Sequence, residues 1–148
     1  MRESVGAPAP CNESGRHLEV GDFDFDGQLD AAAPLDDSGG YGSSTYDVFL
    51  FDQKSARFQH SEELSDLTRE YMGMFRVDSR RRRLTVVAKS GWAIHYYAEY
   101  AVRDRKPVLV KHVTETVRYD PSCQVTIQTS QPVTRTRACT PGERPTRR

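Results

Sequence analysis

The sequence lacks a long apolar run and an excess of charge of either sign. None of its hydrophobic stretches approaches the roughly 20 residues that a membrane-spanning helix requires. The segment from Met1 to Pro10 also lacks the basic-then-apolar order of a secretory signal. Only 36% of the residues are hydrophobic and the mean hydropathy is −0.70, so polar surface outweighs core. A chain of 148 residues with this composition predicts one compact domain, with any membrane contact made only through a lipid anchor that this chain does not carry.

A recognisable catalytic constellation is also missing. No nucleophile is accompanied by a base and a group that orients the base. His95 and Glu99 alternate along one strand-like run, where we expect them to be polar partners across a sheet rather than an acid and a base. The remaining histidines lie in separate segments and give little support to a transition-metal site: His17, His60 and His112. We therefore expect no enzymatic activity.

The zero net charge hides a strong asymmetry along the chain. Residues 1–74 contain 5 Lys and Arg against 15 Asp and Glu, whereas residues 75–148 contain 16 against 6. A nucleic-acid-binding domain is expected to be net basic, so this balance argues against nucleic acid as a partner. The asymmetry predicts an acidic face and a basic face on one body, and it favours a polar protein partner.

The segment Asp22–Asp30 has carboxylates at alternate positions around one glycine. An EF-hand-type calcium loop supplies oxygen donors from positions 1, 3, 5, 7 and 9 around a glycine at position 6. These positions are filled here by Asp22, Asp24, Asp26, the Gln28 carbonyl and Asp30, with Gly27 sixth. Position 12 is Ala33 instead of glutamate, so the loop is not an EF-hand, and Asp36 or Asp37 is expected to supply the missing ligand. We predict a structural calcium ion in a β-turn; an acidic turn exposed to water is the alternative.

The three cysteines divide into a pair and a remainder. Cys123 and Cys139 bracket two short Thr-rich runs that are typical of a β-hairpin, and a disulfide between them would staple that hairpin. Two reduced thiols are the alternative. Disulfides and weak calcium loops both belong outside the cytosol, so we expect this sequence to represent a mature or truncated form that has lost its signal. Cys11 is assigned no role.

Short β-rich runs recur along most of the chain and predict an all-β fold. We expect a twisted antiparallel sheet of about eight strands, built from hairpins, in a single domain over residues 17–139. Residues 1–16 are expected to be a disordered leader and residues 140–148 a flexible tail. The run Arg80–Arg83 is expected to be a charged hairpin turn, and Ser61–Tyr71 a short helix behind an acidic first turn. The strand candidates are 18–20, 29–33, 46–52, 74–77, 84–88, 92–102, 108–117 and the hairpin between the cysteines.

Two segments have the composition of recognition loops. Tyr41 stands alone among the glycines and serines of segment 36–44, which is typical of a rigid aromatic anchor on an adaptable backbone. The second segment places Ser90, Gly91 and Trp92 at a corner between strands, with Tyr96 following. The alternative for both segments is a tight turn whose aromatic side chain covers the end of a sheet. Strand alternation also places Trp92 and Tyr96 with the core-facing residues of run 92–102.

Four segments together resemble a known family. They are Val20–Asp30, Gly39–Asp52, Phe58–Ser65 and Lys89–Trp92, within a match over about residues 18–118. The sequence resembles the calcium-binding immunity proteins that accompany bacterial-killing type IV secretion systems, which are similar in fold to periplasmic inhibitors of invertebrate-type lysozyme. The resemblance implies a periplasmic protein that inhibits a lysozyme-like peptidoglycan hydrolase by inserting loops into its cleft. Trp92 and then Tyr96 stand where the inhibitor pattern has a tyrosine soon after Ser-Gly.

The resemblance also implies roles for particular residues. It assigns a structural calcium ion to the Asp22–Asp30 loop and cleft insertion to the loops that contain Tyr41, Ser90, Gly91, Trp92 and Tyr96. A different function remains open, namely a calcium-stabilised glycan or cell-wall binding module in which the three aromatic residues stack on sugars. An adhesion module is a further alternative.

Overall fold

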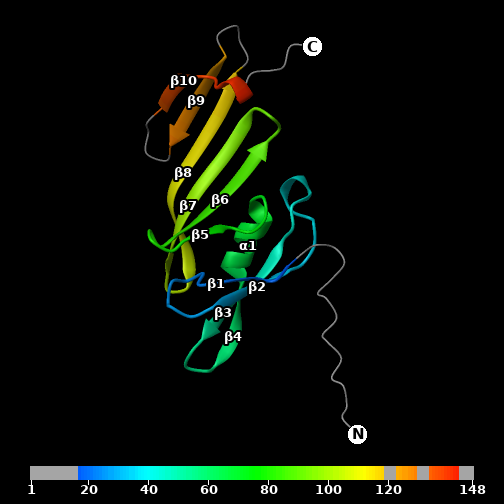
Figure 1. The fold of residues 1–148 in the computed structure, drawn as a ribbon, viewed down its shortest axis with the longest axis vertical. Helices are drawn as coiled ribbons and strands as arrows, with labels where there is room; N and C mark the ends of the chain where they lie inside the picture. Colours follow the sequence, from blue (N-terminus) through cyan, green and yellow to red (C-terminus); the bar gives the residue numbers. More distant parts are fainter. Residues whose placement is uncertain (1–16, 119–122, 130–133, 144–148) are drawn as a thin grey trace.

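The chain folds into two antiparallel sheets and one helix (Figure 1). The computed structural model describes residues 17–118, 123–129 and 134–143. The four-stranded sheet has the order β1 (Glu19–Gly21), β2 (Asp30–Pro34), β3 (Tyr46–Asp52) and β4 (Arg57–Ser61). The six-stranded sheet has the order β10 (Thr134–Ala138), β9 (Gln124–Thr129), β8 (Lys106–Arg118), β7 (Ile94–Arg103), β6 (Arg83–Ser90) and β5 (Arg76–Asp78). Helix α1 (Glu62–Glu70) connects the two sheets.

The all-β prediction with one short helix is confirmed, whereas the division of the strands differs from the expected arrangement. In the described part of the chain, ten strands form two sheets instead of about eight in one sheet, because α1 interrupts the hairpin series between β4 and β5. Strand β4 was not predicted. Four of its five residues are exposed, so it carries no apolar alternation that reveals a strand.

The main core lies where both sheets meet the helix. Sheet residues such as Val48 and Leu84 are fully buried, as is Leu64 of α1. Burying each such side chain contributes roughly 1.5–3 kcal/mol. The core cluster consists of Phe23, Phe25, Ala32, Val48, Leu50, Leu64, Leu67, Phe75, Leu84, Val86 and Ala98. It therefore joins the segment that contains the acidic loop to both sheets.

Helix α1 begins and docks through hydroxyl groups. The Ser61 side chain accepts a hydrogen bond from the Leu64 N–H, which satisfies one of the free donors of the first turn. Farther along the helix, Ser65 Oγ accepts from the Val48 N–H at 2.9 Å and Thr68 Oγ1 accepts from the Tyr46 N–H at 2.9 Å. The helix thus covers backbone donors of β3.

The long strand β7 shows the expected alternation of core-facing and solvent-facing residues, but the turn that precedes it does not. Ala98 is buried, and Tyr100 and Val102 pack against the core cluster, as alternation predicts. Trp92 lies in the turn before β7 and is 64% exposed. Its placement among core-facing residues was wrong, because the strand begins only at Ile94.

The far end of the six-stranded sheet has its own small core. A disulfide joins Cys123 and Cys139, whose Cα atoms lie 5.5 Å apart, and both residues are buried with Val117 and Val125. Of the expected tail 140–148, the described part forms a turn at Pro141–Glu143, and Arg137 donates two hydrogen bonds to the Glu143 carboxylate. The expected leader, Cys11 and residues 144–148 lie outside the described residues. Within the described part of the chain, no helix is long and apolar enough to cross a membrane.

Candidate recognition site and acidic loop

The loop that carries Tyr41 is held closed by its own polar groups. The Thr45 N–H donates to the Asp36 carbonyl at 2.7 Å, and the Thr45 hydroxyl donates to the Asp36 carboxylate at 2.7 Å. Gly39 is required sterically, because a Cβ there would lie 2.5 Å from Ser43 Oγ. At the tip, Tyr41 adopts a positive φ of 58° and leaves 60% of its surface exposed. The loop therefore presents this tyrosine on a fixed backbone.

The second predicted loop forms the corner between β6 and β7. Ser90 ends β6, and Gly91 follows with a φ of 62°, which a glycine adopts without strain. The corner is tied to the sheet on its other side, where the Val117 N–H donates to the Ala93 carbonyl at 2.7 Å. Trp92 projects from this corner with most of its surface accessible.

The structure brings the two loops together. The Gly91 N–H donates a hydrogen bond to the Tyr41 Oη, although the two residues are 50 positions apart. The Lys89 Nζ lies 4.6 Å from the centroid of the Tyr41 ring, a cation–π contact. Because the phenol oxygen accepts from Gly91, its own proton remains available for an external acceptor. Tyr41, Lys89, Gly91 and Trp92, hereafter the paired-loop site, form one surface.

Tyr96 does not belong to this surface in the same way. It lies inside β7, paired with Ala88 and Thr114 across the sheet. Its ring stacks on His112 of β8, with centroids 6.2 Å apart and an interplanar angle of 22°. The three-aromatic platform expected for a glycan module is therefore reduced to Tyr41 and Trp92.

The acidic loop wraps its backbone around its own carboxylates. The Asp22 carboxylate accepts from the Asp26 and Gly27 N–H groups, each at 3.0 Å. Asp26 Oδ1 accepts from the Gln28 N–H at 2.8 Å. The turn requires a φ of 90° at Gly27, which favours glycine at this position. These bonds fix the direction of the side chains in the predicted calcium loop.

Three of the predicted ligands converge. One carboxylate oxygen from each of Asp22, Asp24 and Asp30 lies within 4.8 Å of the others. Asp24 and Asp30 are buried, and Asp24 Oδ2 has no hydrogen-bond partner. A buried carboxylate oxygen without a donor is suited to a cation, and an all-oxygen set suits calcium. This group of three carboxylates does not include Asp26.

Burial and mutual repulsion perturb these carboxyl groups. Burial, together with the charges of Asp30 and Asp26, raises the pKa of Asp24 to about 6. Burial also raises the pKa of Asp30, although two backbone N–H groups donate to its carboxylate, from Phe23 at 2.7 Å and from Phe51 at 2.9 Å. Without a cation, the loop therefore holds negative charge in an unfavourable environment.

The candidates for a missing ligand lie elsewhere. Asp36 Oδ1 accepts from the Ser38 N–H and hydroxyl and from the Thr45 hydroxyl. Asp37 Oδ1 accepts from the Ser44 hydroxyl at 2.8 Å. Both aspartates therefore stabilise the Tyr41 loop, and the converging acidic group does not include them.

Two arginines from the six-stranded sheet contact the acidic loop, and sequence reasoning missed both. Arg105, in the β7–β8 turn, places its Nε 3.4 Å from Asp24 Oδ2 and donates to the Phe51 carbonyl at 3.2 Å. Arg82, within the charged run at the β5–β6 turn, donates to the Phe25 carbonyl at 2.6 Å and stacks on the Phe25 ring. The acidic loop is thus a junction between the two sheets.

One Ser–His–carboxylate arrangement resembles a catalytic triad in composition only. Ser65 Oγ lies 3.2 Å from His60 Nε2, and His60 Nδ1 lies 3.5 Å from the Glu62 carboxylate. The Ser65 hydroxyl is fully buried, donates to the Ser61 carbonyl and accepts from the Val48 N–H. It holds the helix against β3 and offers no oxygen to a substrate.

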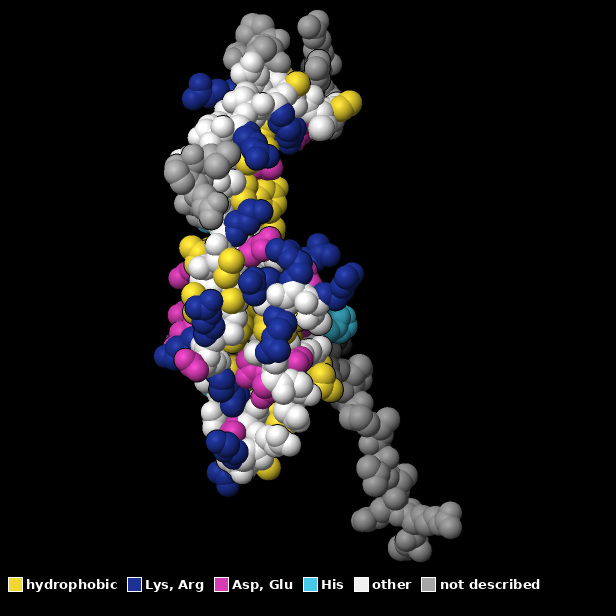
Figure 2. Space-filling view, turned by 90° about the vertical axis from the view of Figure 1, so that its left-hand side faces the viewer, with side chains coloured by type: hydrophobic (Ala, Val, Ile, Leu, Met, Phe, Trp, Pro, Cys, Tyr) yellow, Lys and Arg dark blue, Asp and Glu magenta, His cyan; other side chains and the backbone are white. Residues whose placement is uncertain are grey.

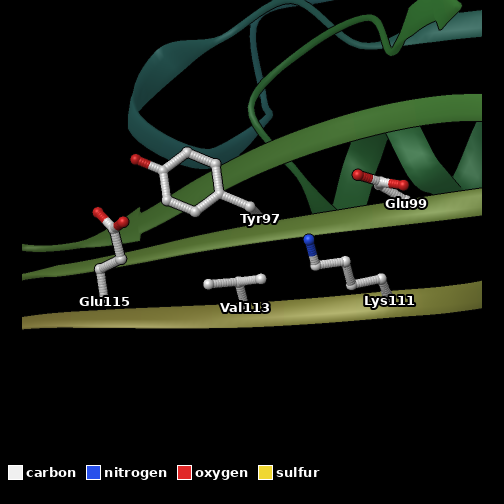
Figure 3. Close-up of a pocket in the computed structure, with 5 residues that line it drawn as sticks. All are labelled: Tyr97, Glu99, Lys111, Val113 and Glu115. Carbon is white, nitrogen blue, oxygen red and sulfur yellow. The ribbon is translucent and has the colours of Figure 1, made fainter. Parts of the chain in front are cut away.

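The six-stranded sheet also has a shallow hollow of about 280 Å³ on one face (Figure 3). Tyr97 and Glu115 lie at one end, Glu99 and Lys111 at the other, and Val113 between them. Glu99 is engaged by Arg81 at 2.6 Å. The hollow is open and mixed in charge, so it defines no particular ligand.

Comparisons with known proteins give one informative match. No family model matches the sequence, and no curated protein matches it. A solved structure described as that of a Xanthomonas type IV secretion system related protein is similar, with a TM-score of 0.64 and 25% sequence identity. The match covers 82% of this chain and 58% of that chain. This chain therefore spans less than two thirds of the length of its neighbour.

Proposed function

We propose that this protein is an immunity protein of a bacterial type IV secretion system that inhibits a lysozyme-like peptidoglycan hydrolase. The paired-loop site carries the proposal, because two loops that are distant in sequence converge to present Tyr41 and Trp92. The type IV secretion association of the structural neighbour supports the biological setting. The protein acts by binding and not by catalysis, and its expected location is the periplasm, where peptidoglycan is hydrolysed.

The chemistry of the paired-loop site suits a hydrolase cleft. A lysozyme-like enzyme has two carboxyl groups flanking the scissile bond, one of which acts as a general acid. The Tyr41 hydroxyl has a proton to donate to such a carboxylate, and Lys89 places a positive charge beside the same ring. Trp92 fills an apolar sugar subsite, with Ser90 and Gly91 forming the corner that carries it. Tyr96 supports the corner from within β7.

A calcium ion is proposed to stabilise the acidic loop. Asp22, Asp24 and Asp30 would hold the ion, with Asp26 and the Gln28 carbonyl completing the oxygen set. The ion supplies positive charge and no redox chemistry. Asp30 begins β2, which leads directly into the Tyr41 loop, so order in the acidic loop is transmitted to the paired-loop site.

The test is the rate of turbidity loss of a peptidoglycan suspension treated with lysozyme-like hydrolases, above all one encoded beside this gene. We expect stoichiometric inhibition by the parent protein and a loss of at least about 2 kcal/mol of binding free energy for Tyr41→Ala. Tyr97→Ala is the matched control, because Tyr97 is also an accessible tyrosine but lies in β7, in the separate hollow. Equal inhibition constants for the two variants would contradict the assignment.

Glycan binding is the second candidate, supported by the two exposed aromatic residues at the paired-loop site. A glycan module would bind purified peptidoglycan. It could slow a hydrolase only by covering that insoluble substrate, and not by binding the enzyme. An inhibitor would reduce the rate of one hydrolase on a soluble oligosaccharide as well as on the insoluble wall. The soluble substrate therefore separates the two functions.

A further inference from the structure

Part of strand β8 has a sheet neighbour on one side only. Strand β7 pairs with β8 along its length, from Lys106 to Thr116. Strand β9 pairs only with the later part, from Val113 to Arg118. Among the described residues, no strand pairs with the other side of Lys106–Lys111, hereafter the free edge of β8. In an antiparallel ladder, alternate residues direct their N–H and C=O groups away from the partner strand, so this edge offers backbone hydrogen bonds.

The free edge is also apolar at its centre. Val108, Leu109 and Val110 are 39%, 51% and 47% exposed. Figure 2, which faces the side of the molecule where β8 lies in Figure 1, shows hydrophobic side chains at the surface among Lys and Arg side chains in its middle region. A long apolar edge strand normally leads to association unless charge or irregularity prevents it. We therefore expect either that another strand binds this edge or that features of the edge prevent such binding.

Its flanking charges indicate which occupant fits. Lys106 and Lys111 bracket the apolar centre. The Lys106 Nζ lies 2.7 Å from the Glu63 carboxylate of α1, whereas the ion pairs of the described residues do not include Lys111, which lies opposite Glu99 in the sheet. If two copies paired antiparallel with Val108 opposite Leu109, Lys106 of each copy would face Lys111 of the other. Like charges directly opposite each other destabilise a strand pair. This arrangement disfavours a second copy, although Glu63 offsets part of the charge of Lys106, and it leaves Lys111 as the cation that an acidic residue of an added strand can meet.

Backbone irregularities limit the length of the added strand. Pro107 has no N–H to donate, and the pairing register with β7 shifts between Glu99 and Tyr100, opposite Val110. Only a short segment centred on Leu109 can therefore add to the sheet. We propose that the free edge of β8 binds an extended segment of a partner protein whose short apolar centre is flanked by acidic residues. The segment pairs through its backbone. One of its carboxylates meets Lys111, and the other competes with Glu63 for Lys106.

This edge is independent of the paired-loop site. The free edge adjoins the β7–β8 turn, whereas Gly91 and Trp92 lie before the opposite end of β7. Ten residues of extended strand separate the two ends, which is roughly 30 Å. A partner on the free edge therefore leaves Tyr41 and Trp92 accessible, and loss of one interaction does not imply loss of the other.

The experiment uses the full chain and three labelled peptides with the same apolar centre, Val-Thr-Val-Val. The first has glutamates at both ends, the second has lysines, and the third is the glutamate peptide with alternate backbone nitrogens methylated. Fluorescence anisotropy measures binding, and amide hydrogen exchange measures protection of Leu109. We expect saturable binding of the glutamate peptide with slower exchange at Leu109, and weak binding of the other two.

Charge variants provide the control. Lys111→Glu should lower the affinity for the glutamate peptide by about fivefold and raise the affinity for the lysine peptide. Lys54→Glu makes the same charge change at the β3–β4 turn and should alter neither affinity. The proposal is overturned by the absence of saturable binding, by binding that survives backbone methylation, or by equal responses to the two charge variants. A parent protein that sediments as a dimer with Leu109 protected would assign the edge to a second copy instead.

Discussion

Among single residues, Asp24 combines a buried side chain with little compensation by hydrogen bonds. Its side chain is 2% exposed and one oxygen has no hydrogen-bond donor, so its negative charge is costly in the absence of a cation. The raised pKa of about 6 expresses the same cost, because the folded protein binds a proton at this site more tightly than the unfolded chain does. The Arg105 Nε, 3.4 Å from Asp24 Oδ2, offsets only part of this cost, so a cation bound in the loop would favour folding.

This cost predicts opposite effects of Asp24→Asn with and without calcium. In calcium-free buffer at pH 7, the variant should be more stable than the parent by about 1–3 kcal/mol, because the buried charge is removed. In excess calcium, the variant should be less stable, because a ligand is lost. The free energy of unfolding in urea, measured in both buffers, tests the reversal.

The pH dependence gives the control for this prediction. Because the folded-state pKa is raised, Asp24 costs the calcium-free parent stability progressively as the pH rises from about 4 to about 6. The advantage of Asp24→Asn should therefore shrink toward pH 4. A variant that is destabilised in both buffers at pH 7 would contradict the idea that this carboxylate awaits a cation.

At the scale of elements, the β7–β8 turn acts on the acidic loop through Arg105. Two residues, Asp104 and Arg105, form this turn with φ values of 50° and 64°, which matches the twist of the flanking strands. The geometry aims the Arg105 guanidinium at Asp24 Oδ2 and at the Phe51 carbonyl. A cation in the loop and this guanidinium then repel each other.

We therefore expect Arg105→Ala to tighten calcium binding several-fold while lowering the stability of the calcium-free protein. The first effect follows from removing a like charge beside the ion, and the second from leaving Asp24 without its neighbouring cation. Isothermal titration and urea unfolding measure the two quantities. The matched control is Arg103→Ala, which removes an arginine two positions earlier on the same hairpin, at the end of β7. Weaker calcium binding by Arg105→Ala would contradict this prediction and would mean that Arg105 holds the acidic loop in its binding conformation.

The same elements show why some features of the fold and the candidate site could be predicted from the sequence and others could not. The spacing of Asp22, Asp24 and Asp30 is local, so their convergence could be predicted from a short segment. Helix α1 was predictable because an acidic first turn is followed by Leu64 and Leu67 at helical spacing. Contacts such as Arg105 with Asp24, or Tyr41 with Gly91, join residues far apart in the chain and depend on how two sheets pack. No local pattern contains that information.

Across the whole molecule, the opposed charges of the two halves meet at the sheet junction. The acidic loop belongs to the negative half, and Arg82 and Arg105 come from the positive half. Part of the charge asymmetry that predicted opposed faces is therefore used inside the protein, between its sheets. The paired-loop site also joins the two halves, through a cation–π contact of Lys89 from the second half with Tyr41 from the first.

The described residues form two separate cores, and this separation predicts a local effect of the disulfide. Cys123 and Cys139 pack with Val117 and Val125, away from the core that holds the acidic loop and α1. On the chain-entropy model, a bridge around a loop of this length contributes roughly 3 kcal/mol. Replacing both cysteines with alanine should therefore loosen β9 and β10 first.

Hydrogen exchange is the measurement, because it reports each strand separately. Amides of β9 and β10 should exchange much faster in the double variant, whereas those of β3 and α1 should keep their protection. The proposed inhibition of a hydrolase should persist, because the paired-loop site depends on β6, β7 and the Tyr41 loop. Loss of protection throughout, or loss of inhibition together with the hairpin, would mean that β8 couples the two cores more tightly than their separate packing implies.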